Sequence, residues 1–331
     1  MIETLEDGMT TVVKFHKTGG PGVLSVEEVV VGKPKRGEAR VRHTAIGLNF
    51  IDTYHRSGLY PLPLPSGVGL EGAGVVEAVG AGVTNVKPGD RVAYAGGPPG
   101  AYAQERNMPA AKLVKVPAGV SDEDAAAMML KGLTVQMLIR RVYRVQKGDT
   151  VLFHAAAGGV GLIACQWLNA LGATVIGTVG SDAKAKIAKA HGCHYTINYS
   201  KENFADRVRK ITKGRGVPVV FDSVGKDTFH GSLDCLQPRG LVTVFGNGSG
   251  PVKDVDINIL AKGSYYVTRP SIMIYTAQRA DLEASAKELF SMVKSGKVKI
   301  DINQRYALTD AAKAHRDLEA RKTTRSTILL P

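Results

Sequence analysis

The fold is decided by the stretch Asp149-Thr-Val-Leu-Phe-His-Ala-Ala-Ala-Gly-Gly-Val-Gly-Leu-Ile-Ala-Cys165. Residues 150–154 are an apolar run that predicts a buried strand, and apolar residues at helical spacing follow the glycines. Between them, Ala155, Gly158 and Gly161 form a shifted version of the G-x-G-x-x-G pattern. Small residues between a strand and a helix let the backbone approach a pyrophosphate, whose charge then lies on the first N–H groups of the helix. Because strands precede and follow it, this turn is predicted to bind a dinucleotide rather than to be an ordinary tight turn.

Beyond this turn, the pattern alternates between short apolar runs and amphipathic segments. The expected strands are residues 174–179, 195–198, 217–222, 240–245 and 265–268, and the expected helices are residues 184–190, 204–212 and a segment around 233–235. This rhythm predicts an α/β domain of the Rossmann class, a doubly wound parallel sheet with helices on both faces. A long amphipathic helix is expected over residues 279–295.

Residues 11–120 have a different pattern, in which short apolar runs are separated by turns rich in Gly, Pro and charged residues. Many short strands separated by such turns predict a small β-barrel, with residues 57–69 as a loop. At Ser121, an N-cap followed by three acidic residues predicts a helix, and residues 133–143 predict a second one. A last strand over residues 326–330 is expected to return to this first domain.

The composition limits the class of protein. The chain has 331 residues, enough for about two domains, and a hydrophobic content of 44% that is ordinary for a globular protein. No apolar run approaches the ~20 residues of a membrane span, and the first ten residues lack the shape of a signal peptide. Cys165, Cys193 and Cys235 are spaced too widely for a disulfide framework. These features favour a cytoplasmic protein that does not contact membranes.

The formal net charge of +13 is carried by scattered lysines and arginines. They indicate a solvated basic surface, or attraction of an anionic ligand such as a phosphorylated cofactor. No basic run is interleaved with aromatic residues, so nucleic acid is not expected as a partner, although charge alone leaves it as an alternative.

The histidines give little support for a metal site. Among the eight, only His191 and His194, which flank Gly192-Cys193, lie at close spacing to a cysteine, and one local combination such as His191-x-Cys193 cannot complete a tetrahedral site. No Ser–His–Asp elbow, paired carboxylates or P-loop is visible. The chemistry is therefore expected to come largely from a cofactor that the protein binds and orients.

The residues after the second strand bear on the choice between NADPH and NADH. An acidic residue that binds a ribose 2′-hydroxyl is expected at the end of this strand, but the chain has Gly180 and Ser181 there. Asp182 comes late and Lys184 follows it, which favours a 2′-phosphate and therefore NADPH. The alternative is that Lys184 is a solvated lysine and that Asp182 binds the ribose.

The run Gly148-Asp149-x-x-Leu152-x-x-x-Ala156-Ala157-Gly158-Gly159-x-Gly161-x-x-x-x-Gln166 is one of several motifs that point to one family. The others are residues 45–54, 56–60, 65–67, 131–134, 222–225 and 245–247. Over essentially the whole chain they resemble the zinc-independent quinone oxidoreductase and zeta-crystallin family of the medium-chain dehydrogenase/reductase superfamily. The resemblance implies a GroES-like catalytic domain over residues 1–132 and 274–331, and a Rossmann NADPH-binding domain over residues 133–273.

The resemblance also implies that zinc is absent. Zinc-dependent relatives carry a cysteine in the segment where this chain has residues 49–52, and a histidine in a Gly-His-Glu motif where it reads Gly69-Leu70-Glu71. No metal ligands are therefore expected, and NADPH is the expected cofactor.

The same motifs imply the residues of the site. Those implied at the pyrophosphate are Gly158, Gly159 and Val160. Those implied at the adenosine ribose and its 2′-phosphate are Gly180, Ser181, Lys184, Tyr199 and Arg321, with Val224 at the adenosine edge. Those implied along the nicotinamide half are Phe245, Gly246, Asn247, Gly248 and Arg269. Those implied around the nicotinamide and substrate are Asn49, Asp52, Tyr54 and Thr134.

The expected activity is NADPH-dependent reduction of quinones by hydride transfer, with Asn49 and Tyr54 as the catalytic residues. The chain could instead reduce α,β-unsaturated ketones or aldehydes, or bind NADPH without turnover in a crystallin-like or RNA-binding role. Asn49 could also simply hydrogen-bond the loop backbone, and Tyr54 could be a rim aromatic. The resemblance implies a homodimer, through the strands near residues 240–245 and 265–268.

Overall fold

The computed structural model describes residues 8–331, which divide into two compact units. Unit 1 comprises residues 8–130, 279–290 and 300–331, and unit 2 comprises residues 131–278 and 291–299. No helix within residues 8–331 combines the length and the apolar character needed to cross a membrane.

Unit 2 is built on a six-stranded parallel sheet in the order β11-β10-β9-β12-β13-β14. The strands are β9 (Thr150–Phe153), β10 (Thr174–Val179), β11 (Tyr195–Asn198), β12 (Val217–Asp222), β13 (Leu236–Val244) and β14 (Tyr266–Thr268). The chain starts at β9 in the middle, runs outward to β11, and then restarts beside β9 with β12. This order is the doubly wound arrangement that the sequence predicts.

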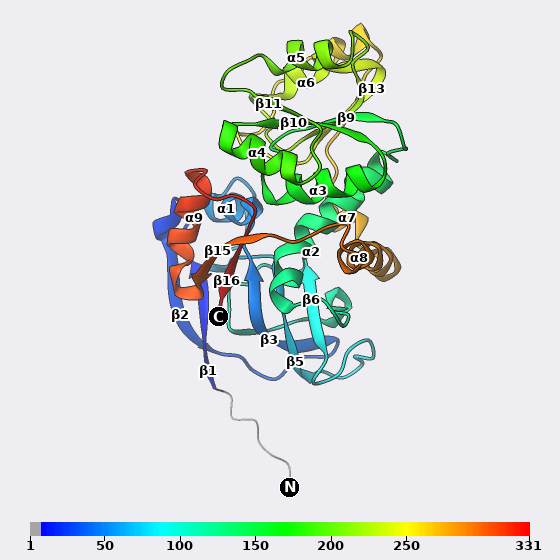
Figure 1. The fold of residues 1–331 in the computed structure, drawn as a ribbon. Helices are drawn as coiled ribbons and strands as arrows, with labels where there is room; N and C mark the ends of the chain where they lie inside the picture. The colour runs from blue at the N-terminus through cyan, green and yellow to red at the C-terminus, as the bar shows by residue number, and fades with distance from the viewer. Residues whose placement is uncertain (1–7) are drawn as a thin grey trace. The chain divides into compact units, whose positions relative to one another are not determined.

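Helices cover both faces of this sheet (Figure 1). They are α3 (Gly159–Ala170), α4 (Asp182–Ala190), α5 (Phe204–Ile211) and α6 (Phe229–Asp234). Helices α3 and α4 lie on one face, and α5 and α6 lie on the other. Side chains of the central strands, such as Leu152, Ile176 and Val220, are fully buried because both faces of the sheet are covered.

Unit 1 contains two sheets. A three-stranded sheet has the order β2-β1-β4, and a seven-stranded sheet runs β15-β16-β3-β5-β6-β8, with β7 also paired to β3. The strands are β1 (Met9–Phe15), β2 (Leu24–Val30), β3 (Glu38–Gly47), β4 (Ser66–Gly67), β5 (Glu71–Val79), β6 (Arg91–Ala95), β7 (Glu105–Pro109), β8 (Val114–Lys115), β15 (Ile302–Ala307) and β16 (Ser326–Leu330). Strand β16 pairs with β3 through Ile328 and Gly47, so the expected return of the last strand is confirmed.

The main differences from the sequence-based expectations lie in the helices. Helix α1 (Phe50–Ser57) was not expected. The prediction of two helices around residues 121–143 is wrong, because α2 (Asp122–Gln136) continues directly into a π-helical turn (Met137–Val142). Leu130 and Leu133 are both buried, and this burial outweighs the cost of about 1 kcal/mol for the glycine between them. The remaining helical elements are η1 (Pro21–Val23), η2 (Ala110–Lys112), η4 (Ile257–Lys262), α7 (Ile272–Tyr275), α8 (Arg279–Lys294), η5 (Leu308–Asp310) and α9 (Ala311–Glu319).

Candidate functional site

The carboxyl edge of the parallel sheet in unit 2 gathers most of the residues that the sequence singles out. The segments that carry them directly follow the six strands: residues 155–161, 180–184, 199, 224, 245–248 and 269. Because the strands are parallel, all six segments leave the sheet at the same edge. The chain changes direction between β9 and β12, and at such a switch point the loops on either side diverge and leave room for a ligand.

The glycine turn after β9 exposes backbone rather than side chains. Gly158 is the N-cap of α3 and has no side chain that could cap the first N–H groups of the helix. A Cβ on Gly161 would lie 2.4 Å from the carbonyl oxygen of Ala155, closer than any real Cβ contact. Ala155 itself has a positive φ of 53°. The turn is therefore held in a tight form that leaves the helix N-terminus available to an anionic group.

The turn after β10 combines a close aromatic contact with a helix cap. A Cβ on Gly180 would lie 2.6 Å from the hydroxyl oxygen of Tyr199, so the ring of Tyr199 lies close against this glycine. Ser181 is the N-cap of α4, and its hydroxyl oxygen accepts a hydrogen bond of 3.3 Å from the backbone N–H of Lys184. The structure thus brings together all four residues expected at the ribose in unit 2.

Asp182, the alternative ribose ligand, already has partners. Its carboxylate accepts hydrogen bonds of 2.6 Å from Lys201 and 2.8 Å from Asn198. These hydrogen bonds, first that of Lys201 and then that of Asn198, lower the pKa of Asp182. A carboxylate engaged in this way is less suited to accept from a ribose, which weighs against the alternative in which Asp182 binds the cofactor.

The loops after β12 and β13 are held together by a buried carboxylate that the sequence reasoning did not single out. Asp222 has no exposed surface, and its Oδ1 accepts from the backbone N–H groups of Val224 (2.8 Å) and Gly225 (3.0 Å). Gly246 packs against this loop, since a Cβ there would lie 2.3 Å from the carbonyl oxygen of Ser223. Asp222 therefore fixes the loop that carries Val224. The only signal for it was its place in the motif of residues 222–225.

The other expected residues of this edge are also placed beside β13. Phe245 packs against Phe153 with ring centroids 5.8 Å apart, and Asn247 is buried. Gly248 donates its N–H to the Ser223 carbonyl at 3.1 Å. Arg269 donates from Nη1 to the Val244 carbonyl at 3.0 Å.

In unit 1, helix α1 carries the expected substrate-side residues. Asn49 is its N-cap, and the Asn49 backbone N–H donates to Asp52 Oδ2 at 2.8 Å. The Asn49 side chain donates from Nδ2 to Glu71 Oε2 at 2.7 Å. Asp52 and Glu71 are both fully buried. Asn49 therefore lies between two buried carboxylates, which fix its backbone and its side chain separately.

Glu71 is a second residue that the site assignment lacked, although it belongs to the quoted Gly69-Leu70-Glu71. Its Oε1 accepts from the backbone N–H of Leu130 at 2.6 Å. Gly47 leaves room for it, because a Cβ there would lie 2.1 Å from Glu71 Oε2. Among residues 8–331, no group of three or more His, Cys, Asp or Glu side chains is placed to hold a metal ion.

Three further residues were expected at the site: Tyr54, Thr134 and Arg321. Tyr54 is half-buried on α1, with its ring edge-on to Tyr60 at a centroid distance of 5.3 Å. Thr134 is half-buried on α2, and Arg321 follows α9 with a positive φ of 57°. Tyr54 and Arg321 belong to unit 1, and Thr134 belongs to unit 2.

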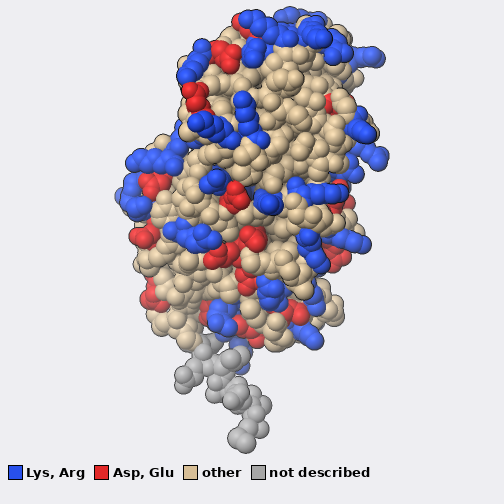
Figure 2. Space-filling model, viewed as in Figure 1, with Lys and Arg blue, Asp and Glu red and all other residues tan. Residues whose placement is uncertain are grey.

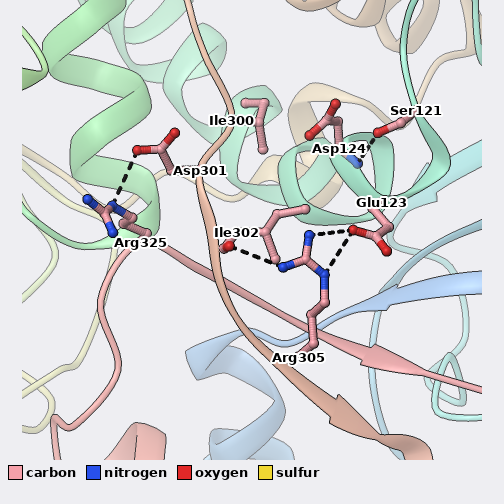
Figure 3. A pocket seen from close by; sticks show the side chains of 8 residues that line it. All are labelled: Ser121, Glu123, Asp124, Ile300, Asp301, Ile302, Arg305 and Arg325. Atoms are coloured by element: carbon pink, nitrogen blue, oxygen red, sulfur yellow. Dashed lines mark hydrogen bonds and ion pairs between the residues drawn. The ribbon is translucent and has the colours of Figure 1, made fainter.

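A separate pocket in unit 1 contains none of the expected residues (Figure 3). Its cavity volume is about 560 Å³, and four of the five charged side chains that line it form two ion pairs. Arg305 donates to Glu123 at 2.6 and 3.0 Å, and Arg325 lies 3.3 Å from Asp301. These ion pairs engage both arginines of the pocket, so it is a weaker candidate for the site than the two regions above.

The basic residues form no single stripe on the face shown in Figure 2. Lys and Arg side chains are scattered over it, with Asp and Glu among them. This distribution agrees with the solvated basic surface that the sequence indicates.

Comparison with known proteins places the chain in a family. The model of the alcohol dehydrogenase GroES-like domain matches residues 35–118, and that of zinc-binding dehydrogenases matches residues 159–291. A quinone oxidoreductase of Pseudomonas aeruginosa is 57% identical over 321 residues, which cover 96% of this chain and 99% of that protein. The chain belongs to the quinone oxidoreductase family.

Other members of the family extend this likeness. The crystal structure of Escherichia coli quinone oxidoreductase complexed with NADPH has a TM-score of 0.96 and 52% identity, and the match covers 97% of this chain and 100% of that one. A 2-haloacrylate reductase of a Burkholderia species is 47% identical, covering 98% of this chain and 99% of that protein. The resemblance and the fold class expected from the sequence, a GroES-like domain with a Rossmann domain, are confirmed.

Proposed function

We propose that this protein reduces quinones with NADPH by hydride transfer, without a metal ion. The observation that carries the proposal is the carboxyl edge of the six-stranded parallel sheet. At this edge lie the N-terminus of α3, which no side chain caps, the lysine Lys184 and the two glycine-containing loops 155–161 and 245–248. The relatives named quinone oxidoreductase, and the E. coli relative described with NADPH, support the same activity.

The residues of unit 2 fit a phosphorylated dinucleotide. Gly159 and Val160 would bind the pyrophosphate through their N–H groups, because these lie at the start of α3 and no side chain caps them. The Gly158 N–H donates to the Ala155 carbonyl at 2.9 Å, so Gly158 would contribute by letting the pyrophosphate approach the backbone. Lys184 would pair with a 2′-phosphate, supported by the prior engagement of Asp182 with Lys201. The further residues proposed to bind the cofactor are Gly180, Ser181, Tyr199, Val224, Phe245, Gly246, Asn247, Gly248 and Arg269 from unit 2, and Arg321 from unit 1.

NADPH, when bound, would supply the hydride from its nicotinamide ring. The protein's own task is to orient the acceptor and to stabilise the negative charge that develops on its oxygen. Asn49 is suited to this because an amide nitrogen carries two hydrogens and Glu71 takes only one of them. We propose that Asn49 and Tyr54 donate to the acceptor oxygen, that Thr134 contributes to cofactor binding, and that solvent supplies the proton. Asp52 has no exposed surface, so its proposed role at the site is to hold Asn49.

The direct test is NADPH oxidation with 1,4-quinones, ortho-quinones and α,β-unsaturated ketones side by side, with and without a chelator. We expect turnover with quinones that the chelator does not change. Loss of activity in the chelator would contradict the metal-free mechanism. NADPH binding without turnover of any acceptor would contradict the enzymatic proposal and favour a binding role.

A second candidate is the reduction of activated carbon–carbon double bonds. It is supported by the 47% identity to a 2-haloacrylate reductase. The same assay with a 2-haloacrylate added distinguishes the two, because this candidate requires a higher kcat/KM for the 2-haloacrylate or the enones than for any quinone.

We also propose a cytoplasmic homodimer that pairs through β14. This strand ends the sheet in the described residues, and Tyr266 and Val267 on it are 61% and 40% exposed. An exposed edge strand is a ready partner for its symmetry copy. Sedimentation should find a dimer for the wild type and a monomer for Val267→Lys. Tyr195→Lys, on β11 at the opposite edge, should leave the dimer intact.

A further inference from the structure

A chain of hydrogen bonds runs through unit 1 from α9 to the amino end of α1. At one end, the Arg56 guanidinium pairs with Glu319, with Nη1 donating at 3.1 Å. Arg56 Nη1 also lies 3.3 Å from His315 Nδ1, and His315 Nε2 lies 3.0 Å from the Tyr102 hydroxyl. The Tyr102 hydroxyl donates to Asp52 Oδ2 at 3.0 Å, the same oxygen that accepts from the Asn49 backbone.

Every member of this chain except Glu319 is buried. Arg56 is 1% exposed, and Asp52, Tyr102 and His315 have no exposed surface. Water therefore does not replace a partner that is removed, and each group depends on its neighbour in the chain.

The direction of each hydrogen bond follows from the chemistry of the groups. Burial and the Arg56 guanidinium lower the pKa of His315 to about 3, so its imidazole is neutral near pH 7. A guanidinium only donates, so Nδ1 of His315 is the acceptor and Nε2 carries the hydrogen. Nε2 donates to Tyr102, whose hydroxyl then has its own hydrogen for Asp52. Burial and the Asp52 carboxylate raise the pKa of Tyr102 well above its ordinary value, so this hydrogen stays in place.

We propose that Tyr102 is a positioning residue for the reaction: its hydroxyl, oriented by His315, holds the Asp52 carboxylate on the Asn49 backbone and so sets the position of the Asn49 side chain. The proposal rests on the role of Asn49 under the proposed function. Asp52 Oδ2 accepts from the Tyr102 hydroxyl in the core and from the backbone N–H of Asn49, the residue that would contact the acceptor. Tyr102→Phe removes the donor that ties this oxygen to the core.

The same unit provides a matched control. Tyr94 is also fully buried, and its hydroxyl lies 2.7 Å from Nε2 of His43. Nδ1 of His43 lies 2.7 Å from the Ala103 carbonyl oxygen, so this pair ends on backbone outside α1. Tyr94→Phe thus removes a buried hydroxyl from a Tyr–His pair without touching the Asp52–Asn49 link.

The test compares Tyr102→Phe with Tyr94→Phe in the full-length protein. We expect kcat for a 1,4-quinone to fall about tenfold or more in Tyr102→Phe, since small displacements of orienting groups have effects of this size. The Kd for NADPH should stay within about twofold of that of Tyr94→Phe. In the protein without cofactor, amide exchange at Asn49 should speed up about tenfold in Tyr102→Phe only, while exchange in β9 and β10 is unchanged.

Two substitutions of His315 test the direction of the hydrogen bonds from Arg56 to Tyr102. In His315→Gln, the side-chain oxygen can accept from Arg56 while the side-chain nitrogen donates to Tyr102, so we expect kcat close to that of the wild type. In His315→Leu neither bond is possible, and kcat should fall as in Tyr102→Phe. If Tyr102→Phe does not fold, this pair decides the question.

Equal kcat values for Tyr102→Phe and Tyr94→Phe, or for His315→Gln and His315→Leu, would overturn the inference and leave quinone reduction in place. Unchanged exchange at Asn49 in a folded Tyr102→Phe would overturn it as well. If the wild type does not oxidise NADPH with any of the acceptors tested, the proposed function is overturned, and this inference with it.

Discussion

The two candidate regions differ in the groups that form them: backbone groups in unit 2 and side chains in unit 1. At the carboxyl edge of unit 2, the groups offered to a ligand are backbone N–H groups and glycines that directly follow their strands. Around α1 in unit 1, side chains hold the key residues, and buried Asp52 and Glu71 take partners from distant segments. The first region should therefore be sensitive to any added Cβ, and the second to the loss of a single polar atom.

The largest effect is expected in unit 1, from Glu71→Ala. Removing this buried carboxylate takes away the acceptor of the Leu130 N–H and of the Asn49 side-chain amide. This loss should lower the unfolding free energy by about 3 kcal/mol. The measurement is denaturant unfolding followed by circular dichroism. Glu28→Ala, which removes an exposed carboxylate that accepts from Thr11, should change stability by less than about 0.5 kcal/mol. Similar losses for both variants would remove the contrast between buried and exposed carboxylates.

The corresponding change in unit 2 is Gly161→Ala. The new Cβ would meet the Ala155 carbonyl, so the turn must shift, and we expect the Kd for NADPH to rise about 100-fold, or about 2.7 kcal/mol. Fluorescence titration of NADPH measures it. Gly20→Ala is the control, because its φ of −71° suits alanine and no atom lies within 4 Å of its Cβ. An unchanged Kd in Gly161→Ala would show that backbone geometry does not limit this site.

Acid should lower the unfolding free energy through the buried His315 of unit 1. The pKa of His315 is lowered to about 3, so below pH 6.5 the unfolded chain binds a proton that the folded chain does not. The stability from this group is complete above pH 6.5 and falls as the pH drops toward 3. By pH 5 the loss is about 2 kcal/mol. Unfolding curves at pH 7 and pH 5 should show a smaller decrease for His315→Gln than for the wild type, and equal decreases would contradict this assignment.

The smallest expected effect is on NADPH affinity and comes from Lys184, the lysine assigned to the cofactor site in unit 2. Lys184→Ala should raise the Kd for NADPH about tenfold, or about 1.4 kcal/mol, and leave that for NADH unchanged, because only NADPH carries the 2′-phosphate. Lys189→Ala on the same helix should change neither value. An equal loss for both cofactors would mean that Lys184 does not distinguish them.

The sequence was most informative where structure depends on neighbouring residues. Strands β10, β11 and β12 begin and end where their apolar runs predict. Helix α1 was missed because its buried residues include Asp52, His55 and Arg56, which reverses the usual pattern of apolar residues inside. The partners of these polar side chains were equally invisible, since Tyr102 and His315 are 213 positions apart and belong to no common motif.

The sequence by itself determined the glycine turn, the alternation of strands and helices and the family. These depend on backbone sterics and on hydrophobic periodicity within about a dozen residues. The tertiary structure decided that Asn49 is held by Glu71 and Asp52, and that Asp182 is engaged by Lys201. A buried polar group needs a partner, but only the packing of distant segments determines which partner it finds.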